Sequence, residues 1–330
     1  MTIPEIPQIV LQIANDIKVM KIRGAGKIAR SAAEALKQAS INYKGPYELA
    51  VFKKYMGRVA DILISTRPTA VSLPNAVIYV ISGLLNAGSY KDAHEIVVER
   101  AERFIKQSLE AVDKASKIGA KRIRENSVVL THCHSTAAVK TIIEAYKLGK
   151  VVKAYSTETR PFYQGRITST QLLENNVPVI QIPDSAIRYV MHEVDHVVIG
   201  ADTVTAIGEV VNKIGTSQVA AVAKEHGVPV QVIAESYKFS PMTLMGDPVV
   251  IEFRDPREIV PEEWLNKHPG IEVLNPSFDI TPPRYIDAIV TENGVIPPYA
   301  AILVLKEMWG WVLEEMRRTG LGYLRFEEIL

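Results

Sequence analysis

The sequence predicts an α/β protein, with an N-terminal helical domain over residues 1–125 and a Rossmann-like domain with a mainly parallel sheet over residues 126–330. Before residue 125, apolar residues recur with the 3.6-residue period of helices. Beyond it, short apolar runs alternate with helical stretches, which is typical of βαβ units in a parallel sheet. The chain has 330 residues, of which 47% are hydrophobic, and this is enough for two such domains.

The first domain is expected to contain five helices. One helical face near the start carries Ile6, Ile9, Val10, Ile13 and Ile17. Further helices are expected at 28–39, at 46–66 with a proline at its start, at 73–85 and at 93–118. Two basic turns separate them, at 21–27 and 65–69, and the proline that follows Arg67 moves this residue out of the helical region.

The second domain is expected to alternate strands and helices. Strands are predicted at 128–130, 151–155, 179–182, 196–199 and 230–234, with helices at 137–148, 167–175, 185–193 and 216–226 between them. Short strands at 278–280 and 288–290 and a helix at 301–315 complete the pattern. The segment 275–299 otherwise shows little regular structure and is too apolar to lie free in solvent, so we expect an oligomer interface there.

Composition narrows the class of protein. The formal net charge is +1 with no run of like charges, so we expect no nucleic-acid partner. The single cysteine, Cys133, allows no internal disulfide and suits a reducing cytoplasm. No apolar stretch is long enough to span a membrane, and the first residues lack the basic-then-apolar pattern of a signal peptide. We therefore expect a cytoplasmic protein with no membrane partner.

The stretch 128–136, VVLTHCHST, reads as a buried strand, a tight turn and a helix N-terminus. Such a turn directs backbone N–H groups at one point, which favours anion binding and lowers the pKa of a thiol. Taken alone, a single cysteine at a strand end is more often a small buried hydrophobic residue. His132 and His134 flank it, but without a second cysteine we expect no zinc site, and both histidines should pack or shape the turn.

Polar residues also follow the other predicted strands, where ligands bind in an open parallel sheet. They are Ser135, Glu158–Arg160, Asp184–Ser185, Asp202, Asn212–Thr216 and Glu235–Lys238. Each has a structural alternative, because aspartate and serine are common helix caps and lysines are usually solvated. Their convergence favours a site. The sequence has no GxSxG elbow and no Walker loop, and the glycine-rich turn at 23–26 lacks the preceding strand and third glycine of a dinucleotide fingerprint.

Seven motifs in order carry a family resemblance: RGAGKIA (23–29), TRPTAV (66–71), LTHCHS (130–135), ETRPFYQGR (158–166), VVIGADTV (197–204), GEVVNKIGT (208–216) and NPSFDITP (275–282). The chain resembles the superfamily that joins sugar-1-phosphate aldose–ketose isomerases to the regulatory subunits of translation initiation factor 2B. Within it, the resemblance is greatest to the archaeal branch of ribose 1,5-bisphosphate isomerases. Methylthioribose-1-phosphate isomerases usually carry Asn-Ala-Gly after the cysteine, where this chain has His134–Ser135–Thr136, and Ser135 is a feature of the initiation-factor side.

The resemblance implies conversion of ribose 1,5-bisphosphate to ribulose 1,5-bisphosphate by ring opening and a cis-phosphoenolate, in AMP and nucleoside degradation that feeds RuBisCO. The isomerases use the cysteine after Thr-His and the aspartate after Gly-Ala as their catalytic pair, and the initiation-factor subunits typically lack both. This implies Asp202 as the acid and Cys133 as the base, its thiolate favoured by the helix N-terminus and nearby cations. No cofactor and no metal are implied.

The resemblance and the turn positions together nominate the residues that bind the substrate: Arg23, Gly24, Ala25, Gly26, Lys27, Arg67, Ser135, Arg160, Asn212, Lys213 and Lys238. So many cations favour a bisphosphate over a 1-phosphate with an apolar 5-substituent. The superfamily pairs its Rossmann-like domains across a two-fold axis, which implies a homo-oligomer, at least a dimer and a hexamer if the pattern holds. Two alternatives stay open, a non-catalytic regulatory subunit of the initiation-factor 2B type and a methylthioribose-1-phosphate isomerase.

Overall fold

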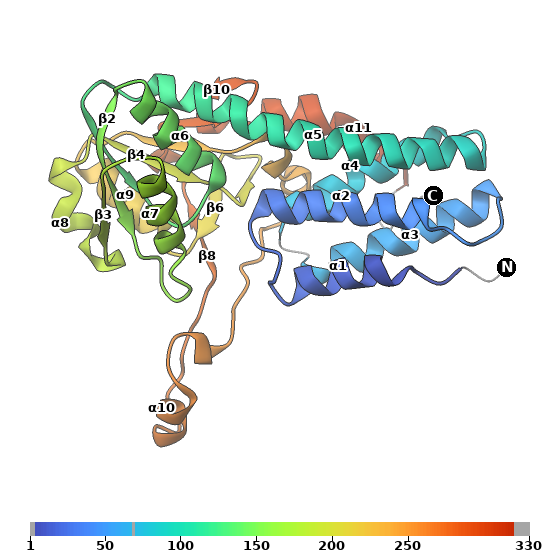
Figure 1. The fold of residues 1–330 in the computed structure, drawn as a ribbon, viewed down its shortest axis with the longest axis horizontal. Helices are drawn as coiled ribbons and strands as arrows, with labels where there is room; N and C mark the ends of the chain where they lie inside the picture. Colours follow the sequence, from blue (N-terminus) through green and yellow to red (C-terminus); the bar gives the residue numbers. More distant parts are fainter. Residues whose placement is uncertain (1–3, 68–69, 320–330) are drawn as a thin grey trace. The chain divides into compact units, whose positions relative to one another are not determined.

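The protein is described by a computed structural model over residues 4–67 and 70–319 (Figure 1). Contacts divide the described chain into two compact units. The helical unit is drawn from Met1–Glu110, Tyr237–Met245 and Leu305–Leu330, and the sheet unit from Ala111–Ser236 and Gly246–Val304. This differs from a single division at residue 125, because one long helix runs through both units and two later segments return to the helical one.

The helical unit contains the five predicted helices: α1 (Gln8–Lys18), α2 (Ala25–Ile41), α3 (Leu49–Thr66), α4 (Ser72–Ile81) and the first part of α5 (Tyr90–Arg122). Most of α11 (Ala301–Thr319) also belongs to it. The buried face of α1 is Val10, Ala14 and Ile17, whereas Ile9 is 48% exposed and lies outside it. The proline at 46 does not start α3. The Tyr43 hydroxyl donates to its carbonyl at 2.9 Å and holds it in the preceding turn.

The sheet unit contains a seven-stranded sheet, ordered β10-β9-β7-β4-β1-β2-β3. Its strands are β1 (Ser127–Thr131), β2 (Val151–Thr157), β3 (Val179–Ile182), β4 (His196–Gly200), β7 (Val230–Ile233), β9 (Ala288–Thr291) and β10 (Gly294–Ile296). All neighbours pair in parallel except β9 and β10. The predicted fold class and mainly parallel sheet are confirmed.

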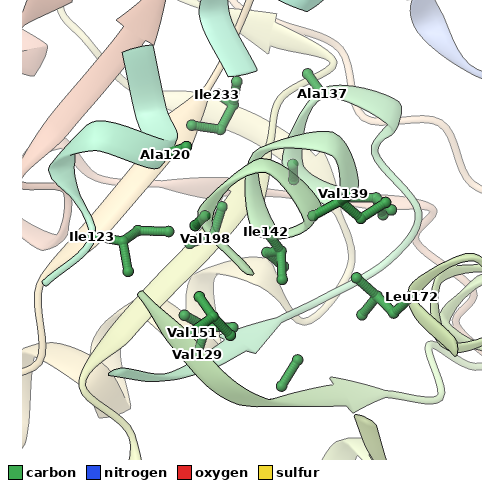
Figure 2. Close-up of a cluster of buried hydrophobic side chains, with 14 of the residues drawn as sticks. Ala120, Ile123, Val129, Ala137, Val139, Ile142, Val151, Leu172, Val198 and Ile233 are labelled. Atoms are coloured by element: carbon green, nitrogen blue, oxygen red, sulfur yellow. The ribbon is translucent and has the colours of Figure 1, made fainter. Parts of the chain in front are cut away.

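Helices connect these strands: α6 (Thr136–Lys147), α7 (Gln164–Glu174), α8 (Ile187–Val190) and α9 (Thr216–Glu225). The stretch 185–193 is not one helix as predicted, since 3₁₀ turns at Asp184–Ala186 and Met191–Glu193 flank the single turn of α8. Figure 2 shows the core that joins the end of α5, α6 and α7 to one face of the sheet, with Ile123, Ile142, Leu172 and Val198 packed together. This burial supplies the main drive for the unit to fold.

A second, three-stranded antiparallel sheet lies in the same unit and consists of β5 (Thr203–Val204), β6 (Val210–Lys213) and β8 (Phe278–Thr281). The strands predicted at 278–280 and 288–290 are confirmed as β8 and β9. The rest of 275–299 was expected to hold little regular structure, but it contains β10 and two 3₁₀ turns. β5 and β10, of two and three residues, are too short to show a period in sequence.

The remaining elements are α10 (Glu262–Lys267), on an excursion from the sheet unit that Figure 1 shows in orange, and α11 (Ala301–Thr319). Further 3₁₀ turns lie at Ser82–Asn86, Ser236–Lys238, Pro241–Met245, Pro256–Glu258, Pro283–Tyr285 and Pro298–Ala300. Among the residues that the structure describes, no helix is both long and apolar enough to cross a membrane.

Candidate active site

The order of strands creates a switch point between β1 and β4. The chain runs outward from β1 through β2 to β3, and then crosses back to place β4 on the other side of β1. Val129 and Leu130 of β1 pair with His196 and Val197 of β4. The segments that follow two such strands lead away from each other, and ligands of open α/β sheets usually bind at such a point, beyond the carboxyl ends of the strands.

Cys133 and Asp202 both lie at this switch point. Cys133 follows the last residue of β1 by two positions, and Asp202 follows the last residue of β4 by two. The Asp202 backbone N–H donates to the carbonyl of Val211 at 2.9 Å, which ties the turn after β4 to the small sheet. Asp202 is half-buried.

Cys133 sits in a constrained turn. Its φ of 68° is left-handed, a conformation that is uncommon for a residue with a side chain and that is often found at functional sites. Its N–H donates to Thr159 Oγ1 at 3.0 Å, and its carbonyl accepts from Thr168 Oγ1 at 2.8 Å. Thr159, in the turn after β2, and Thr168, in α7, therefore hold the backbone of Cys133 at its N–H and its carbonyl.

Ser135 begins α6 as its N-cap, and its hydroxyl accepts from the N–H of Ala138 at 3.3 Å. The same hydroxyl lies against Gly200, where an added Cβ would come within 2.3 Å of Ser135 Oγ. A glycine at the end of β4 is therefore what lets the α6 N-terminus approach this end of the strand.

The protonation state of Cys133 differs from the expectation of a thiolate. Burial raises the pKa of the Cys133 thiol to about 12, and the negative charges of Asp202 and Asp184 raise it further. Lys213 acts in the opposite direction. The sequence placed the thiol at a helix N-terminus, but loss of solvent outweighs the neighbouring positive charge, so the raised pKa favours a neutral thiol at neutral pH.

Asp184 organises the turn that follows β2. Its two carboxylate oxygens accept from the backbone N–H groups of Thr159 and Arg160, each at 2.8 Å. Thr159 is also left-handed, with φ 60°. The Arg160 side chain is exposed, and its guanidinium donates to the carbonyl of Ile259 at 3.3 Å. Asp184 was expected only as a polar residue after a strand, and its role as the acceptor for this turn was not predicted.

Asn212 and Lys213 lie at the end of β6. The Asn212 amide donates to Thr216 Oγ1 at 3.0 Å, and the buried Lys213 ammonium lies 4.6 Å from the centroid of the Phe278 ring. Asp279, on the paired strand β8, accepts from the N–H groups of Gly215 at 2.8 Å and Ser217 at 3.1 Å. It thereby caps α9 from a distant part of the chain.

Burial raises the pKa of Asp279 to about 6, although its hydrogen bonds to the two N–H groups oppose that shift. The residue belongs to the NPSFDITP motif at 275–282, but nothing in that motif indicates a contact with the turn at 213–217. Its role was missed because the pairing of β6 with β8 brings together residues more than 60 positions apart.

The other predicted binding residues lie in the helical unit. Gly24, with φ 86°, is the N-cap of α2, as the glycine-rich turn predicted. The Arg23 guanidinium donates to the carbonyl of Met20 at 2.6 Å, and Arg23 and Lys27 are both exposed. Ser72, at the start of α4, donates to the carbonyl of Ala25 at 2.9 Å. This bond brings the first basic turn beside the segment that follows the second.

Arg67 is the C-cap residue of α3, and the two residues after it, at 68 and 69, lie outside the described part of the chain. Lys238 also belongs to the helical unit, although it was expected at the edge of the sheet. The side-chain amide of Asn75 donates to the carbonyls of Tyr237 and Phe239, each at 2.8 Å, and holds the segment against α4. At Gly26 an added Cβ would lie 2.8 Å from the Tyr237 hydroxyl, so the absence of a side chain there admits this segment.

The candidate residues therefore form two sets. Cys133, Ser135, Arg160, Asp202, Asn212 and Lys213 belong to the sheet unit, and Arg23, Gly24, Ala25, Gly26, Lys27, Arg67 and Lys238 belong to the helical unit. Both histidines beside Cys133 make hydrogen bonds that shape the turn, His132 to Thr157 and Ile214 and His134 to Thr168. No group of three or more acidic, histidine or cysteine side chains that could hold a metal ion was found among the described residues.

Comparison with known proteins identifies the family. A model of the initiation factor 2 subunit family matches residues 21–298, most of the chain. The chain belongs to this family. It is 49% identical over 310 residues to the ribose 1,5-bisphosphate isomerase of Thermococcus kodakarensis, covering 92% of this chain and 96% of that protein.

Two solved structures from Pyrococcus horikoshii share the fold. One is described as translation initiation factor eIF-2B, with a TM-score of 0.77 and 27% identity over 90% of this chain and 99% of that chain. The other is a 5-methylthioribose 1-phosphate isomerase, with a TM-score of 0.74 and 30% identity over 92% of this chain and 88% of that chain. The family thus contains both enzymes and proteins described as initiation factors.

Proposed function

We propose that this protein is an aldose–ketose isomerase that converts ribose 1,5-bisphosphate to ribulose 1,5-bisphosphate. The observation that carries the proposal is the position of Cys133 and Asp202, each two residues beyond adjacent parallel strands at the switch point of the sheet. Isomerisation between C1 and C2 of a sugar needs two groups that exchange protons at one crevice. A relative with 49% identity over nearly the whole chain bears the name of this activity, which supports the same substrate.

The neutral thiol fits this chemistry if Cys133 and Asp202 share one proton. Movement of the thiol proton to the Asp202 carboxylate produces a thiolate and a carboxylic acid, which are the base and the acid that the reaction requires. The pair has one negative charge before and after the transfer, and Lys213, whose charge lowers the pKa of Cys133, favours the thiolate form. The expected roles, Cys133 as base and Asp202 as acid, are thus retained within the proposal.

The reaction then balances without a further reactant. Asp202 protonates the ring oxygen as its bond to C1 breaks, and the thiolate removes the C2 proton while the electrons form a C1–C2 double bond. The resulting enol phosphate loses its C2 hydroxyl proton to the Asp202 carboxylate and becomes a ketone at C2. The Cys133 thiol returns its proton to C1, so both residues end in the states from which they started.

We propose that the cationic residues of each set form a phosphate-binding surface within their own unit. In the helical unit, the Gly24–Lys27 turn directs N–H groups of the α2 N-terminus outward beside Arg23. In the sheet unit, Lys213 supplies positive charge that acts on the Cys133 thiol, and Arg160 adds an exposed guanidinium at the turn after β2. Asn212 supplies an amide for a sugar hydroxyl. The same resemblance suggests a place in AMP and nucleoside degradation in the cytoplasm, before RuBisCO.

The direct test is incubation with ribose 1,5-bisphosphate and detection of ribulose 1,5-bisphosphate. Cys133→Ser and Asp202→Asn should each lower kcat by at least about 100-fold, because acid–base groups contribute roughly 10²–10⁴-fold. Asp255→Asn, at an exposed capping residue, is the control and should retain wild-type kcat. Loss of less than tenfold in Cys133→Ser would remove Cys133 from the mechanism.

A second substrate is tested in the same assay. The 30% identity to a 5-methylthioribose 1-phosphate isomerase makes that monophosphate the relevant competitor. We expect a higher kcat/KM for the bisphosphate, since a neutral 5-substituent leaves cationic side chains without a phosphate. Turnover of neither compound, together with binding to initiation factor 2, would favour a non-catalytic regulatory role instead.

We also propose that the sheet unit pairs with a second copy of the chain. Exposed apolar side chains gather where two segments meet, since an added Cβ at Gly208 would lie 2.2 Å from the carbonyl oxygen of Pro298. Nearby, Ile207 is 63% exposed, Tyr299 67% and Leu303 64%. Burial of these side chains would favour a dimer, or a hexamer built from dimers, and light scattering at micromolar concentration measures the mass.

A further inference from the structure

His132 lies at the centre of the hydrogen bonds around the Cys133 turn, although the proposed chemistry does not use it. It directly precedes the thiol-bearing residue, and only 1% of its surface is exposed. Its Nδ1 lies 2.6 Å from Thr157 Oγ1 and its Nε2 lies 2.8 Å from the carbonyl oxygen of Ile214. The imidazole therefore spans from the end of β2 to the turn that follows β6.

These partners define the protonation of the ring. A carbonyl oxygen only accepts, so Nε2 carries the proton and donates it to Ile214, while Nδ1 accepts from the Thr157 hydroxyl. Burial lowers the pKa of His132 and favours the neutral ring, although the Asp184 carboxylate, 3.9 Å from Nδ1, acts in the opposite direction. A neutral ring with this tautomer is the state that satisfies both bonds at once.

The Thr157 end of the ring continues to Cys133. With its own proton donated to His132, Thr157 Oγ1 can accept from Thr159 Oγ1, which lies 3.3 Å away. Thr159 Oγ1 in turn accepts from the Cys133 N–H at 3.0 Å. A continuous series of hydrogen bonds thus runs from the backbone of Cys133 through two threonines to the imidazole.

The Ile214 end leads to Lys213. Ile214 directly follows Lys213, and the next residue, Gly215, packs on the ring, where an added Cβ would lie 2.9 Å from His132 Cε1. Gly215 has a φ of 101° and donates its N–H to Asp279 at 2.8 Å. The backbone beside Lys213 is therefore held by the imidazole on one side and by a carboxylate on the other.

We infer that His132 is a positioning residue that fixes the Cys133 turn to the Lys213 turn, and so keeps the thiol and the ammonium at a constant separation. This inference rests on the proposed function, because the separation matters only if the thiol must reach its charged form. Misplacement of a reacting group by about 1 Å can cost about 100-fold in rate. The imidazole thus affects turnover without touching the substrate.

Two substitutions of His132 test its hydrogen bonds to Thr157 and to Ile214 separately. The amide of His132→Asn occupies the place of Nδ1 and keeps the bond to Thr157 but loses Ile214. The amide of His132→Gln reaches the place of Nε2 and keeps the bond to Ile214 but loses Thr157. Because the link needs both ends, both variants should lower kcat for ribose 1,5-bisphosphate about 10- to 100-fold, with KM within about threefold of wild type.

The control is His196→Gln, which removes another buried imidazole from the same sheet. His196 lies at the start of β4, at the opposite end of the strand from the switch point, and should retain wild-type kcat when replaced. A kcat within threefold of wild type in either His132 variant would overturn the inference. Thr157→Val, which removes the same bond from the other side, should lower kcat as His132→Gln does and add little to it in the double variant.

A measurement on the wild-type protein does not depend on turnover. Nitrogen-15 NMR at pH 7.5 should show a protonated Nε2 and an unprotonated Nδ1 for His132. A proton on Nδ1 would overturn the inference even if the enzyme is active. If wild type gives the expected spectrum but does not turn over ribose 1,5-bisphosphate, the proposed function is refuted. The hydrogen bonds of His132 would then have a structural role only.

Discussion

Replacement of Asp279 by asparagine should change how the stability of the protein depends on pH. The pKa of this carboxyl is raised from 3.8 to about 6, a shift of about two units, and each unit corresponds to about 1.4 kcal/mol. A raised pKa means that the folded state binds the proton more tightly than the unfolded state. The stability that comes from this proton is complete below about pH 4 and is lost as the pH rises through 6.

Asparagine in this position does not titrate, and its carbonyl oxygen can still accept from Gly215 or Ser217. The free energy of unfolding of Asp279→Asn, relative to wild type, should therefore rise by about 2–3 kcal/mol between pH 4 and pH 7.5. The upper end corresponds to the full shift, and the partial exposure of the residue reduces it.

Urea denaturation of both proteins at several pH values and one protein concentration measures this difference, and all other titrating groups cancel in the comparison. Asp255→Asn is the control. Arg257 lowers the pKa of Asp255 to about 2, so its contribution should stay constant from pH 4.5 to 7.5. A difference between Asp279→Asn and wild type that does not vary with pH would refute the reasoning and show that the two N–H bonds offset the cost of burial.

Three other results are expected. Gly165→Ala should lower stability by more than about 2 kcal/mol, because its Cβ would lie 1.6 Å from the carbonyl oxygen of Thr157, whereas Gly88→Ala, in open space, should leave the melting temperature unchanged. Arg23→Ala should lower kcat as well as raise KM if phosphate binding contributes to catalysis, and unchanged steady-state kinetics would exclude Arg23 from the site. Tyr299→Asp should convert the proposed dimer to a monomer in light scattering, and an unchanged mass would place the interface elsewhere.

Long elements were predicted well because their signal is local. Each helix of the first domain shows the helical period, and the strands β1, β2, β3, β4 and β7 each show a short apolar run. Tertiary contacts then adjust the ends of these elements. The start of α3 moved from Pro46 to Leu49 because Tyr43 binds the proline carbonyl, a contact that a period does not express. The strands β5 and β10 were missed because two or three residues contain no period.

The candidate site residues also divide into those that a local signal places and those that only tertiary contacts place. A thiol and a carboxyl that come after predicted parallel strands must lie at one edge of the sheet, so Cys133 and Asp202 could be placed from sequence. Lys238 could not, since the chain leaves the sheet unit after Ser236 and packs in the helical unit, where Asn75 binds the backbone on both sides of the lysine.

The sequence by itself determined the fold class, the alternation of strands and helices, and the residue types available for proton transfer. Only the tertiary structure decided the protonation of those residues and the hydrogen bonds that hold them in place. Burial, which depends on every neighbour of the thiol, raises the pKa of Cys133 above the value that a helix N-terminus alone would predict. The bond from His132 to Ile214 joins residues 82 positions apart, and such a contact exists only once the sheets have formed.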